Sequence, residues 1–408
     1  HWKFKGEFVK KSFRKDYNVS LFSYFDNFKY NNNEFYSNNW NDLPELILKS
    51  NKKINWFHIY TKLKNGPNTK ESIKIINKLN RKRKNINHYF LDSFLSIGVF
   101  KKVYKDLFKF NKIVNKYQLE SFSFQTKLSD FNIFLFLKND WIESIKGSTL
   151  ASNLVHYNLF ELLLKKLNNQ KIGIYLQENQ SWEYSLINNW KKNNHRKLIG
   201  YQQSTVRFWD LRNFNYYKTY SKENKNNYPR PNFVCINNET AKKYYLKNGY
   251  PSKEIVEVEA LRYQKLIDVK INSNNKFNDK LIILVILEGI KEYDEIFIDM
   301  IIKSKKNLNN KCKFVIKCHP QNIITRDNIE NFIFFSEKNL HHLFYICDIV
   351  FVSNSGSASV EALYFNKPIN ILLDNKRPNL NPLRDNKKIL NIFNYEEIIR
   401  AIEKYNKK

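Results

Sequence analysis

The alternation of apolar and polar segments is clearest in the last third of the chain. Stretches with helical spacing, such as EYDEIFIDMIIKSKKNL and KNLHHLFYICD, separate short apolar runs at 281–287, 312–318, 332–335, 349–352 and 369–373. Apolar runs that alternate with helices predict βαβ units around a parallel sheet buried on both faces. We therefore predict a Rossmann-like domain here, closed by an amphipathic helix (EEIIRAIEKYN) that packs back across the domains.

The first 270 residues carry a weaker pattern of the same kind. Lysine-rich helical segments separate predicted strands at 53–61, 171–177, 197–204 and 232–238. The polar stretch 272–279 has no periodicity and is the predicted linker. The fold class is therefore α/β, with an N-terminal domain over 1–270, a C-terminal Rossmann-like domain over 271–387 and a final helix over 388–408.

Composition narrows the classes of partner. The chain has 408 residues, 42% of them hydrophobic, which is enough for a large core. Its net charge of +30 favours an anionic partner, either a phosphate-bearing substrate, a membrane surface or nucleic acid. Part of that charge reflects a general bias toward Asn, Ile, Lys, Phe and Tyr, so we discount it.

Two features that the sequence lacks, a membrane span and a metal-binding cysteine motif, further narrow the class of protein. No apolar run approaches the roughly 18 residues of a membrane span. The cysteines have no paired metal-ligand spacing, and we predict them to be reduced and buried in a cytoplasmic protein: Cys235, Cys312, Cys318 and Cys347.

The stretch VFVSNSGSASVEALYFNKPINILLD, at 350–374, has the order strand, polar turn, helix, proline, strand. The first N–H groups of a helix lack partners and favour an anion, so this turn predicts a phosphate site. The alternative is that its serines only cap the helix, as serine commonly does. The turn residues concerned are Ser353, Ser355, Gly356, Ser357 and Ser359.

Two further polar elements follow predicted strands. His319 and Pro320 come directly after 312–318, at the strand end where open α/β sheets bind ligands. We predict that His319 protonates or hydrogen-bonds a leaving phosphate, with Lys317 helping to neutralise it. Glu288 and Gly289 follow 281–287, where the carboxylate is a base, a ribose ligand or simply part of a strand-to-helix turn.

These elements, in this order, resemble the acidic-Gly, His-Pro and Ser-rich signature of bacterial sialyltransferases and capsule Kdo transferases. VEALYFNKP at 360–368, which contains Glu361, resembles the helix after the donor site of many GT-B glycosyltransferases. The resemblance implies a GT-B-like fold with the nucleotide-sugar side C-terminal. It also implies a CMP-activated nonulosonic or ulosonic acid as donor. We expect no metal or cofactor, because His319, Lys317 and the helix N–H groups can neutralise the phosphate and no DxD-like pair stands at a suitable strand end.

A longer block, 175–214, is similar to a family of surface-carbohydrate (capsule and O-antigen) biosynthesis proteins. That family reads "GyqHs" where this chain has GYQQS, so Gln203 replaces an expected histidine, and we assign it no acid/base role. Polar residues follow two neighbouring strands in this block: Glu178 and Glu183 after the first, and Gln202, Gln203, Ser204, Thr205 and Arg207 after the second.

The chemistry of this block suggests an acceptor site. Glu178 is the predicted base for an acceptor hydroxyl, and Arg207 or Arg212 would bind a sugar carboxylate through two hydrogen bonds. Arg262, just before the linker, is expected to face the cleft. The alternative is an aromatic core of Trp182, Trp190, Phe208 and Trp209 with solvated charges around it, and for Trp190 we prefer the core.

Together these features predict a metal-independent glycosyltransferase of surface polysaccharide biosynthesis. Its catalytic residues would be Glu178, Glu288 and His319. The acceptor would be a glycan or lipid-linked glycan, which fits a peripheral association of the basic surface with the inner membrane. One alternative is a GT-B transferase that uses a UDP-sugar or CDP-glycerol. Another is a non-catalytic basic protein that binds nucleic acid or anionic lipid, and the placement of Ser and His at strand ends argues against it.

Overall fold

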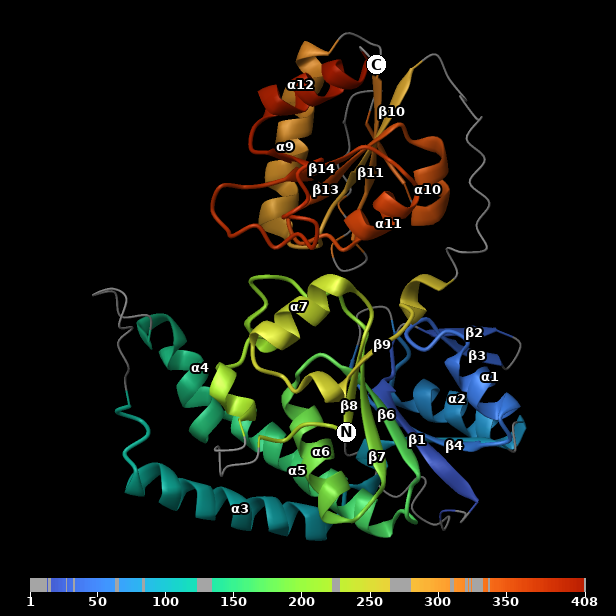
Figure 1. The fold of residues 1–408 in the computed structure, drawn as a ribbon, viewed down its shortest axis with the longest axis vertical. Helices are drawn as coiled ribbons and strands as arrows, with labels where there is room; N and C mark the ends of the chain where they lie inside the picture. The colour runs from blue at the N-terminus through green and yellow to red at the C-terminus, as the bar shows by residue number, and fades with distance from the viewer. Residues whose placement is uncertain are drawn as a thin grey trace. The chain divides into compact units, whose positions relative to one another are not determined.

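The chain forms two compact units in the computed structural model (Figure 1). The first comprises His1–Gln203 and Asn215–Arg262, and the second comprises Ser204–Phe214 and Tyr263–Lys408. The structure describes residues 13, 16–26, 28–31, 34–62, 66–82, 85–122, 134–221, 228–264, 280–308, 312–319, 322, 324, 333–336 and 338–406. The predicted linker at 272–279 and Pro320 lie outside these ranges.

A seven-stranded parallel sheet forms the centre of the first unit, in the order β5-β4-β1-β6-β7-β8-β9. A short antiparallel hairpin, β2 with β3, stands beside it. The strands are β1 (Tyr17–Tyr24), β2 (Phe28–Asn31), β3 (Glu34–Ser37), β4 (Lys53–Ile59), β5 (Ile86–Phe90), β6 (Ile172–Gln177), β7 (Lys197–Gln202), β8 (Phe233–Ile236) and β9 (Ile255–Glu257).

Helices cover this sheet, and one core cluster joins α5 and α6 to its strands through Phe22, Phe57, Phe160 and Trp190. Trp190 is fully buried, as predicted. The helices are α1 (Leu43–Lys49), α2 (Thr69–Lys82), α3 (Ile97–Lys116), α4 (Phe134–Lys146), α5 (Ser148–Lys166), α6 (Ser181–Lys192) and α7 (Glu239–Lys247). Short 3₁₀ turns lie at Leu91–Phe94, Leu211–Asn213, Tyr217–Tyr220, Ser252–Glu254 and Leu261–Tyr263.

The second unit has a six-stranded parallel sheet in the order β12-β11-β10-β13-β14-β15. Its strands are β10 (Leu281–Ile286), β11 (Cys312–Lys317), β12 (Ile333–Phe335), β13 (Ile349–Ser353), β14 (Ile369–Leu372) and β15 (Leu390–Ile392). Its helices are α9 (Lys291–Asn307), α10 (Leu340–Ile346), α11 (Ala358–Tyr364) and α12 (Tyr395–Asn406). These elements confirm the predicted order of strands and helices.

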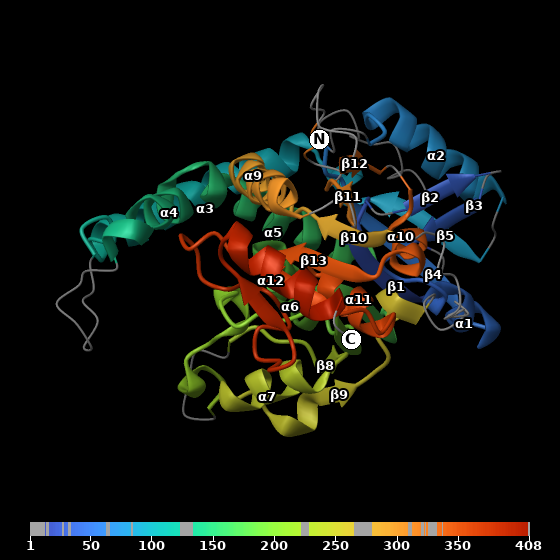
Figure 2. The same cartoon turned by 90° about the horizontal axis from the view of Figure 1, so that it is seen from above.

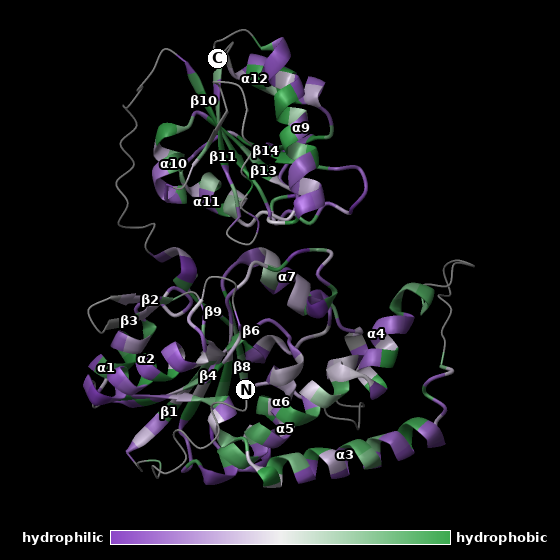
Figure 3. Cartoon of the chain, turned by 180° about the vertical axis from the view of Figure 1, so that it is seen from behind, coloured by the Kyte–Doolittle hydropathy of each residue, from purple (hydrophilic) through white to green (hydrophobic). Residues whose placement is uncertain are grey.

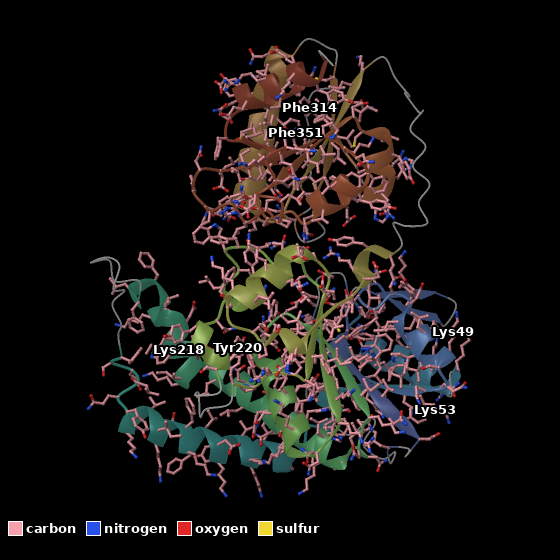
Figure 4. The ribbon with its side chains drawn as sticks, in the orientation of Figure 1. Lys49, Lys53, Lys218, Tyr220, Phe314 and Phe351 are labelled. Carbon is pink, nitrogen blue, oxygen red and sulfur yellow. The ribbon has the colours of Figure 1, made fainter. Side chains whose placement is uncertain are left out.

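Both faces of this second sheet are buried, and its central strands are apolar along their length (Figure 3). Phe314 and Phe351, labelled in Figure 4, fill the face covered by α9 and α12. Phe344 of α10 packs on the other face. The apolar residues of α12 therefore lie in the core of its own unit, and its predicted packing across the domains stays a prediction.

The cysteines are free, and their burial differs from the prediction. Cys312 and Cys347 are buried, whereas Cys235 and Cys318 are only partly buried. Among the described helices, none combines the length and apolar character needed to cross a bilayer.

Two histidines face each other inside the first unit. His58 of β4 and His88 of β5 are 3.0 Å apart, from Nε2 of the first to Nδ1 of the second. Aromatic rings of Phe25, Phe35 and Trp56 surround His58. Burial, together with the neighbouring His88, lowers the pKa of His58 well below its ordinary value.

We expect the first unit to lose stability as the pH falls. Unfolded His58 takes up a proton near pH 6.5, whereas the folded side chain does so only at a lower pH. Because of this residue, the free energy of unfolding should fall by about 1.4 kcal/mol as the pH is lowered from about 7.5 to about 5.5. Urea unfolding followed by tryptophan fluorescence measures it, because Trp209 is the single tryptophan assigned to the second unit.

The matched variants are His58→Phe and His342→Ala. His342 is exposed on α10, so its removal should leave the pH dependence unchanged, whereas His58→Phe should flatten it. An equal dependence in the parent chain and in His58→Phe would show that the buried pair does not govern acid stability.

Candidate functional site

The polar elements predicted in the second unit gather at one edge of its sheet. β10 pairs with β11 on one side and with β13 on the other, all in parallel. The residues that follow these three strands therefore lie at the same carboxyl edge. They include Glu288, Gly289, His319 and the turn 353–357, hereafter the serine turn.

Glu288 is the residue that ties the first of these strand ends to the serine turn. Its Oε2 accepts hydrogen bonds from the backbone N–H of Ser355 (2.9 Å) and from the Ser355 hydroxyl (2.6 Å). Its Oε1 lies 2.6 Å from Nη2 of Arg377, and the side chain is 1% exposed. Both carboxylate oxygens are thus engaged, so Glu288 cannot take a proton from a substrate hydroxyl without losing one of these contacts.

Arg377 is a part of this network that the sequence did not reveal. It follows β14 and forms an ion pair of 2.6 Å with Asp374 as well as the contact with Glu288. Its guanidinium carbon lies 3.2 Å from the centre of the Tyr293 ring. The backbone N–H of Arg377 also donates to Asp374, which closes the loop after the strand. The DNKR run after β14 was the available signal.

Gly289 and His319 are in direct contact. Gly289 has φ of 92°, and a Cβ placed on it would lie 2.6 Å from Nδ1 of His319. Burial lowers the pKa of His319, although the nearby carboxylates of Asp294 and Glu288 oppose that shift. His319 is only partly buried.

Asp294 organises the loop beneath His319. Its carboxylate accepts from the backbone N–H groups of Glu288 (3.0 Å) and Gly289 (3.1 Å) and from Nδ2 of Asn322 (2.8 Å). Burial raises its pKa, and these donors oppose the shift. Asp294 was absent from the sequence prediction, where it reads as an ordinary acidic residue in the first turn of a helix.

The serine turn exposes only part of what was predicted. Ser355, Gly356 and Ser357 are partly buried and accessible, whereas Ser353 and Ser359 are fully buried. The Ser359 hydroxyl faces inward, with two acceptors within reach of its one proton, the Gly356 carbonyl (3.0 Å) and Oδ1 of Asn381 (3.0 Å). Ser357 precedes α11 but makes no side-chain capping bond, so the capping alternative does not describe it.

Two other predicted donor-side residues contact their own unit. Nζ of Lys317 donates to the Ser336 carbonyl (3.3 Å). Glu361 lies on α11, 3.3 Å from Nε2 of His341, with its side chain 13% exposed. Neither contact belongs to the network around Glu288.

In the first unit, the Glu183 side chain caps the N-terminus of α6. Its Oε1 accepts from the backbone N–H groups of Glu178 (2.8 Å) and Gln180 (3.0 Å), and its Oε2 accepts from that of Asn179 (3.1 Å). Burial raises its pKa to about 8 while these donors lower it. Because Glu183 is 1% exposed, its carboxylate stabilises the loop before α6 and is not accessible to the sugar that we predicted it to bind.

Glu178 remains partly exposed at the end of β6, and a second carboxylate, Asp26, stands near it at the end of β1. Burial raises the pKa of Asp26, and the charge of Glu178 adds to that shift. Asn39 links Asp26 to the predicted block, since its Nδ2 donates to Asp26 (3.1 Å) while its Oδ1 accepts from Gln203. The sequence analysis missed Asp26 because nothing in the surrounding YFDN residues identifies it as a candidate catalytic residue.

The remaining predicted acceptor residues behave differently from one another. Gln202 is buried, and its carbonyl accepts from Asn237. Arg212 donates through two nitrogens to Asp210, at 2.9 and 2.8 Å, so its guanidinium group is paired with a carboxylate of its own loop. Arg262 is exposed on the turn at 261–263. Ser204, Thr205 and Arg207 are partly buried, in the segment that belongs to the second unit.

A pocket of about 830 Å³ opens at the carboxyl edge of the first sheet. Tyr24 ends β1 and Tyr60 follows β4, while Trp182 comes from the start of α6 and His156 from α5. The indole N–H of Trp182 donates to the Tyr24 hydroxyl at 2.7 Å and fixes the two aromatic walls. Its residues are scattered from 24 to 182, which explains why no local motif predicted it.

Metal ligands do not cluster in the described part of the chain, where no group of three or more His, Cys, Asp and Glu side chains is arranged to hold an ion.

Comparison with known proteins places the architecture but not the family. No family model and no curated protein matches the chain. Among solved structures it is similar to UDP-GlcNAc 2-epimerase from Methanocaldococcus jannaschii, with a TM-score of 0.50, 11% identity and coverage of 94% of this chain and 91% of that one. It is also similar to CalG4, the calicheamicin glycosyltransferase, with a TM-score of 0.52, 7% identity and coverage of 96% and 90%. The chain therefore has a GT-B-like fold of two Rossmann-like sheets.

Proposed function

We propose that the protein is a glycosyltransferase that takes a sugar from a CMP-activated donor and transfers it to a glycan acceptor of the bacterial surface. The observation that carries the proposal is the joined edge of the second sheet. There, Glu288 holds the serine turn, and the adjacent Gly289 leaves room for the His319 ring. An accessible imidazole beside an accessible Ser-Gly-Ser turn is suited to a phosphate.

In the proposed reaction an acceptor hydroxyl attacks the anomeric carbon of the donor. The bond from that carbon to the phosphate oxygen breaks, and its electron pair leaves with CMP. His319 and the N–H group and hydroxyl of Ser357 stabilise the phosphate charge as it develops, while both donors of Ser355 stay on Glu288. Glu288 acts as a positioning residue, because its carboxylate orients Ser355.

The acceptor side of the proposal rests on the first unit. Glu178 or Asp26 takes the proton of the attacking hydroxyl, and the raised pKa of Asp26 brings that carboxyl nearer to the range useful for a base. Of the aromatic residues that line the pocket, Tyr24 is partly exposed whereas Tyr60 and Trp182 are buried, so the Tyr24 ring is the proposed surface for a sugar ring. We assign no role here to Glu183 or Arg212.

A second candidate is an enzyme acting on a UDP-sugar, by transfer or by epimerisation. The observation in its favour is the fold shared with a protein named as a UDP-GlcNAc 2-epimerase. A donor of the CDP-glycerol kind would use the same edge of the sheet. The nucleobase distinguishes a UDP-sugar from the CMP donor, whereas CDP-glycerol carries the same cytosine and differs from it in having two phosphate groups.

Thermal unfolding with CMP, CDP, UDP, UMP and GDP is the test, repeated on His319→Ala. A nucleotide at about 100 times its dissociation constant stabilises the folded state by about 2.7 kcal/mol. We expect CMP to raise the melting temperature of the parent chain and to leave that of His319→Ala unchanged. His342→Ala is the matched control, because that histidine is exposed on α10 of the same unit and should keep the response.

The outcomes separate the candidates. A shift with UDP or UMP in place of CMP would retain the phosphate site and exchange the donor, and incubation with UDP-GlcNAc would then distinguish transfer from epimerisation. No shift with any of the five nucleotides would contradict the proposed function.

A further inference from the structure

The helix α3 of the first unit turns an apolar stripe toward solvent. Its members are Ile97 (61% exposed), Phe100 (44%), Tyr104 (75%) and Phe108 (57%). They are spaced by three or four residues, so they lie along one side of the helix. We call these four residues the α3 stripe.

The α3 stripe is not the side by which the helix packs. Val99, Val103 and Val114 are the buried residues of α3, and α3 packs against α5. Figures 1 and 2 both show α3 as an outer helix of the first unit. The exposed parts of Ile97, Tyr104 and Phe108 therefore face away from the side on which α3 packs against α5.

Lysines line the same exposed half of the helix. The α3 sequence IGVFKKVYKDLFKFNKIVNK has six lysines and one acidic residue, Asp106. Asp106 accepts a hydrogen bond of 3.0 Å from Asn158, and Lys102 pairs with Glu161, so both are engaged with α5. The remaining five lysines are exposed: Lys101, Lys105, Lys109, Lys112 and Lys116.

The lysines and the stripe adjoin each other. Lys101 and Lys105 each follow a stripe residue directly, which on a helix of 3.6 residues per turn places them about 100° around the axis from it. Nζ of Lys112 lies 4.7 Å from the centre of the Phe108 ring. The outer side of α3 thus consists of an apolar band with a positive band beside it.

The neighbouring helix α4 adds a second apolar surface. Leu135, Phe136 and Leu137, in its first turn, are 69%, 72% and 41% exposed. α4 contacts both α3 and α5, so this turn belongs to the same three-helix subdomain. Exposed apolar side chains that adjoin one another in this number are typical of a surface that binds a protein or a membrane.

We propose that the α3 stripe, its flanking lysines and the first turn of α4 bind an anionic phospholipid surface. Phosphate headgroups attract the lysine ammonium groups, while the Phe, Tyr, Ile and Leu side chains enter the boundary between headgroups and acyl chains. A second copy of this chain would bring five exposed lysines against five others, which charge repulsion opposes. Binding of this kind does not depend on the donor nucleotide.

Sedimentation of the full chain with lipid vesicles tests the proposal. One vesicle is phosphatidylcholine alone, and the other contains phosphatidylcholine and phosphatidylglycerol in equal parts. We expect binding to the anionic vesicle only. Tyr104→Ser with Phe108→Ser should weaken it at least tenfold. The α3 triple variant, Lys101→Glu with Lys105→Glu and Lys109→Glu, should weaken it about a hundredfold or more.

The matched control is Lys74→Glu with Lys78→Glu and Lys82→Glu. These lysines are exposed on α2 with four-residue spacing, and no large apolar side chain of α2 is among the exposed ones. The α2 triple variant should bind vesicles almost as well as the parent. Equal losses in the α2 and α3 triple variants would show that net charge alone drives binding, and this would overturn the proposal.

Two further outcomes bear on it. Full binding by the Tyr104→Ser, Phe108→Ser variant would also overturn the proposal, because both side chains are largely exposed and the variant should fold. Its CMP response in thermal unfolding should match that of the parent, so a failure of lipid binding is distinguishable from a failure of the proposed function.

Discussion

Replacing Glu288 with glutamine is expected to destabilise the second unit by about 3 kcal/mol, near the lower end of the cost of breaking a buried ion pair. The side chain is 1% exposed and meets donors on both sides, Ser355 at Oε2 and Arg377 at Oε1. A glutamine NH₂ group would face a donor in either orientation. Arg377 keeps Asp374 as a partner, which limits the loss.

Amide hydrogen exchange measures this effect within one molecule. Protection of the peptides that cover β13 and the serine turn should fall by about two orders of magnitude, while that of β1 and β6 in the first unit should not change. Glu361→Gln is the control. Its partner His341 is 36% exposed, so its loss should cost less than about 1 kcal/mol. Equal effects of the two substitutions would show that Glu288 does not hold the turn.

Gly289→Ala is expected to abolish most nucleotide binding, with a loss of at least tenfold in affinity. At φ of 92° an alanine costs about 1–3 kcal/mol of backbone strain. Its Cβ would also lie 2.6 Å from Nδ1 and 2.8 Å from Cγ of His319, so the imidazole must move. Both effects act on the strand end that the proposed phosphate site uses.

The variant Gly249→Ala separates the effect of backbone strain from the effect of displacing His319. Gly249 follows α7 in the first unit with φ of 76°, so alanine there carries a comparable backbone strain. We expect this variant to keep its CMP response in calorimetric titration. Intact CMP binding by Gly289→Ala would mean that the position of His319 does not matter to the nucleotide.

Apolar runs predicted the second sheet well, because β10 and β13 are almost entirely apolar and buried, and β11 has an apolar centre with lysines only at 313 and 317. β1 and β5 were missed for the opposite reason. Their buried polar side chains break the apolar pattern, yet each is satisfied inside the protein. Ser20 donates to Gln170, Ser23 accepts from Trp56, and His88 pairs with His58. Partners so distant in sequence leave no local signal.

The sequence analysis predicted where the candidate site lies, but not which way its side chains point. Sequence order placed Glu288, His319 and the serine turn at strand ends, and the parallel register brings those ends together. It did not indicate which side chains turn inward. Ser359 faces Asn381, which becomes its neighbour only after folding, whereas Glu183 faces the backbone N–H groups of the loop directly before it, in a local capping box.

The segment Ser204–Phe214 belongs to the second unit, although the residues on both sides of it belong to the first. Within that unit the guanidinium of Arg384 lies 4.3 Å from the Phe208 ring. During synthesis the ribosome therefore releases this piece of the second unit before the strands β8 and β9 that complete the first sheet. The two units cannot mature strictly one after the other, and a fragment that starts at Tyr263 would lack a piece of its own surface.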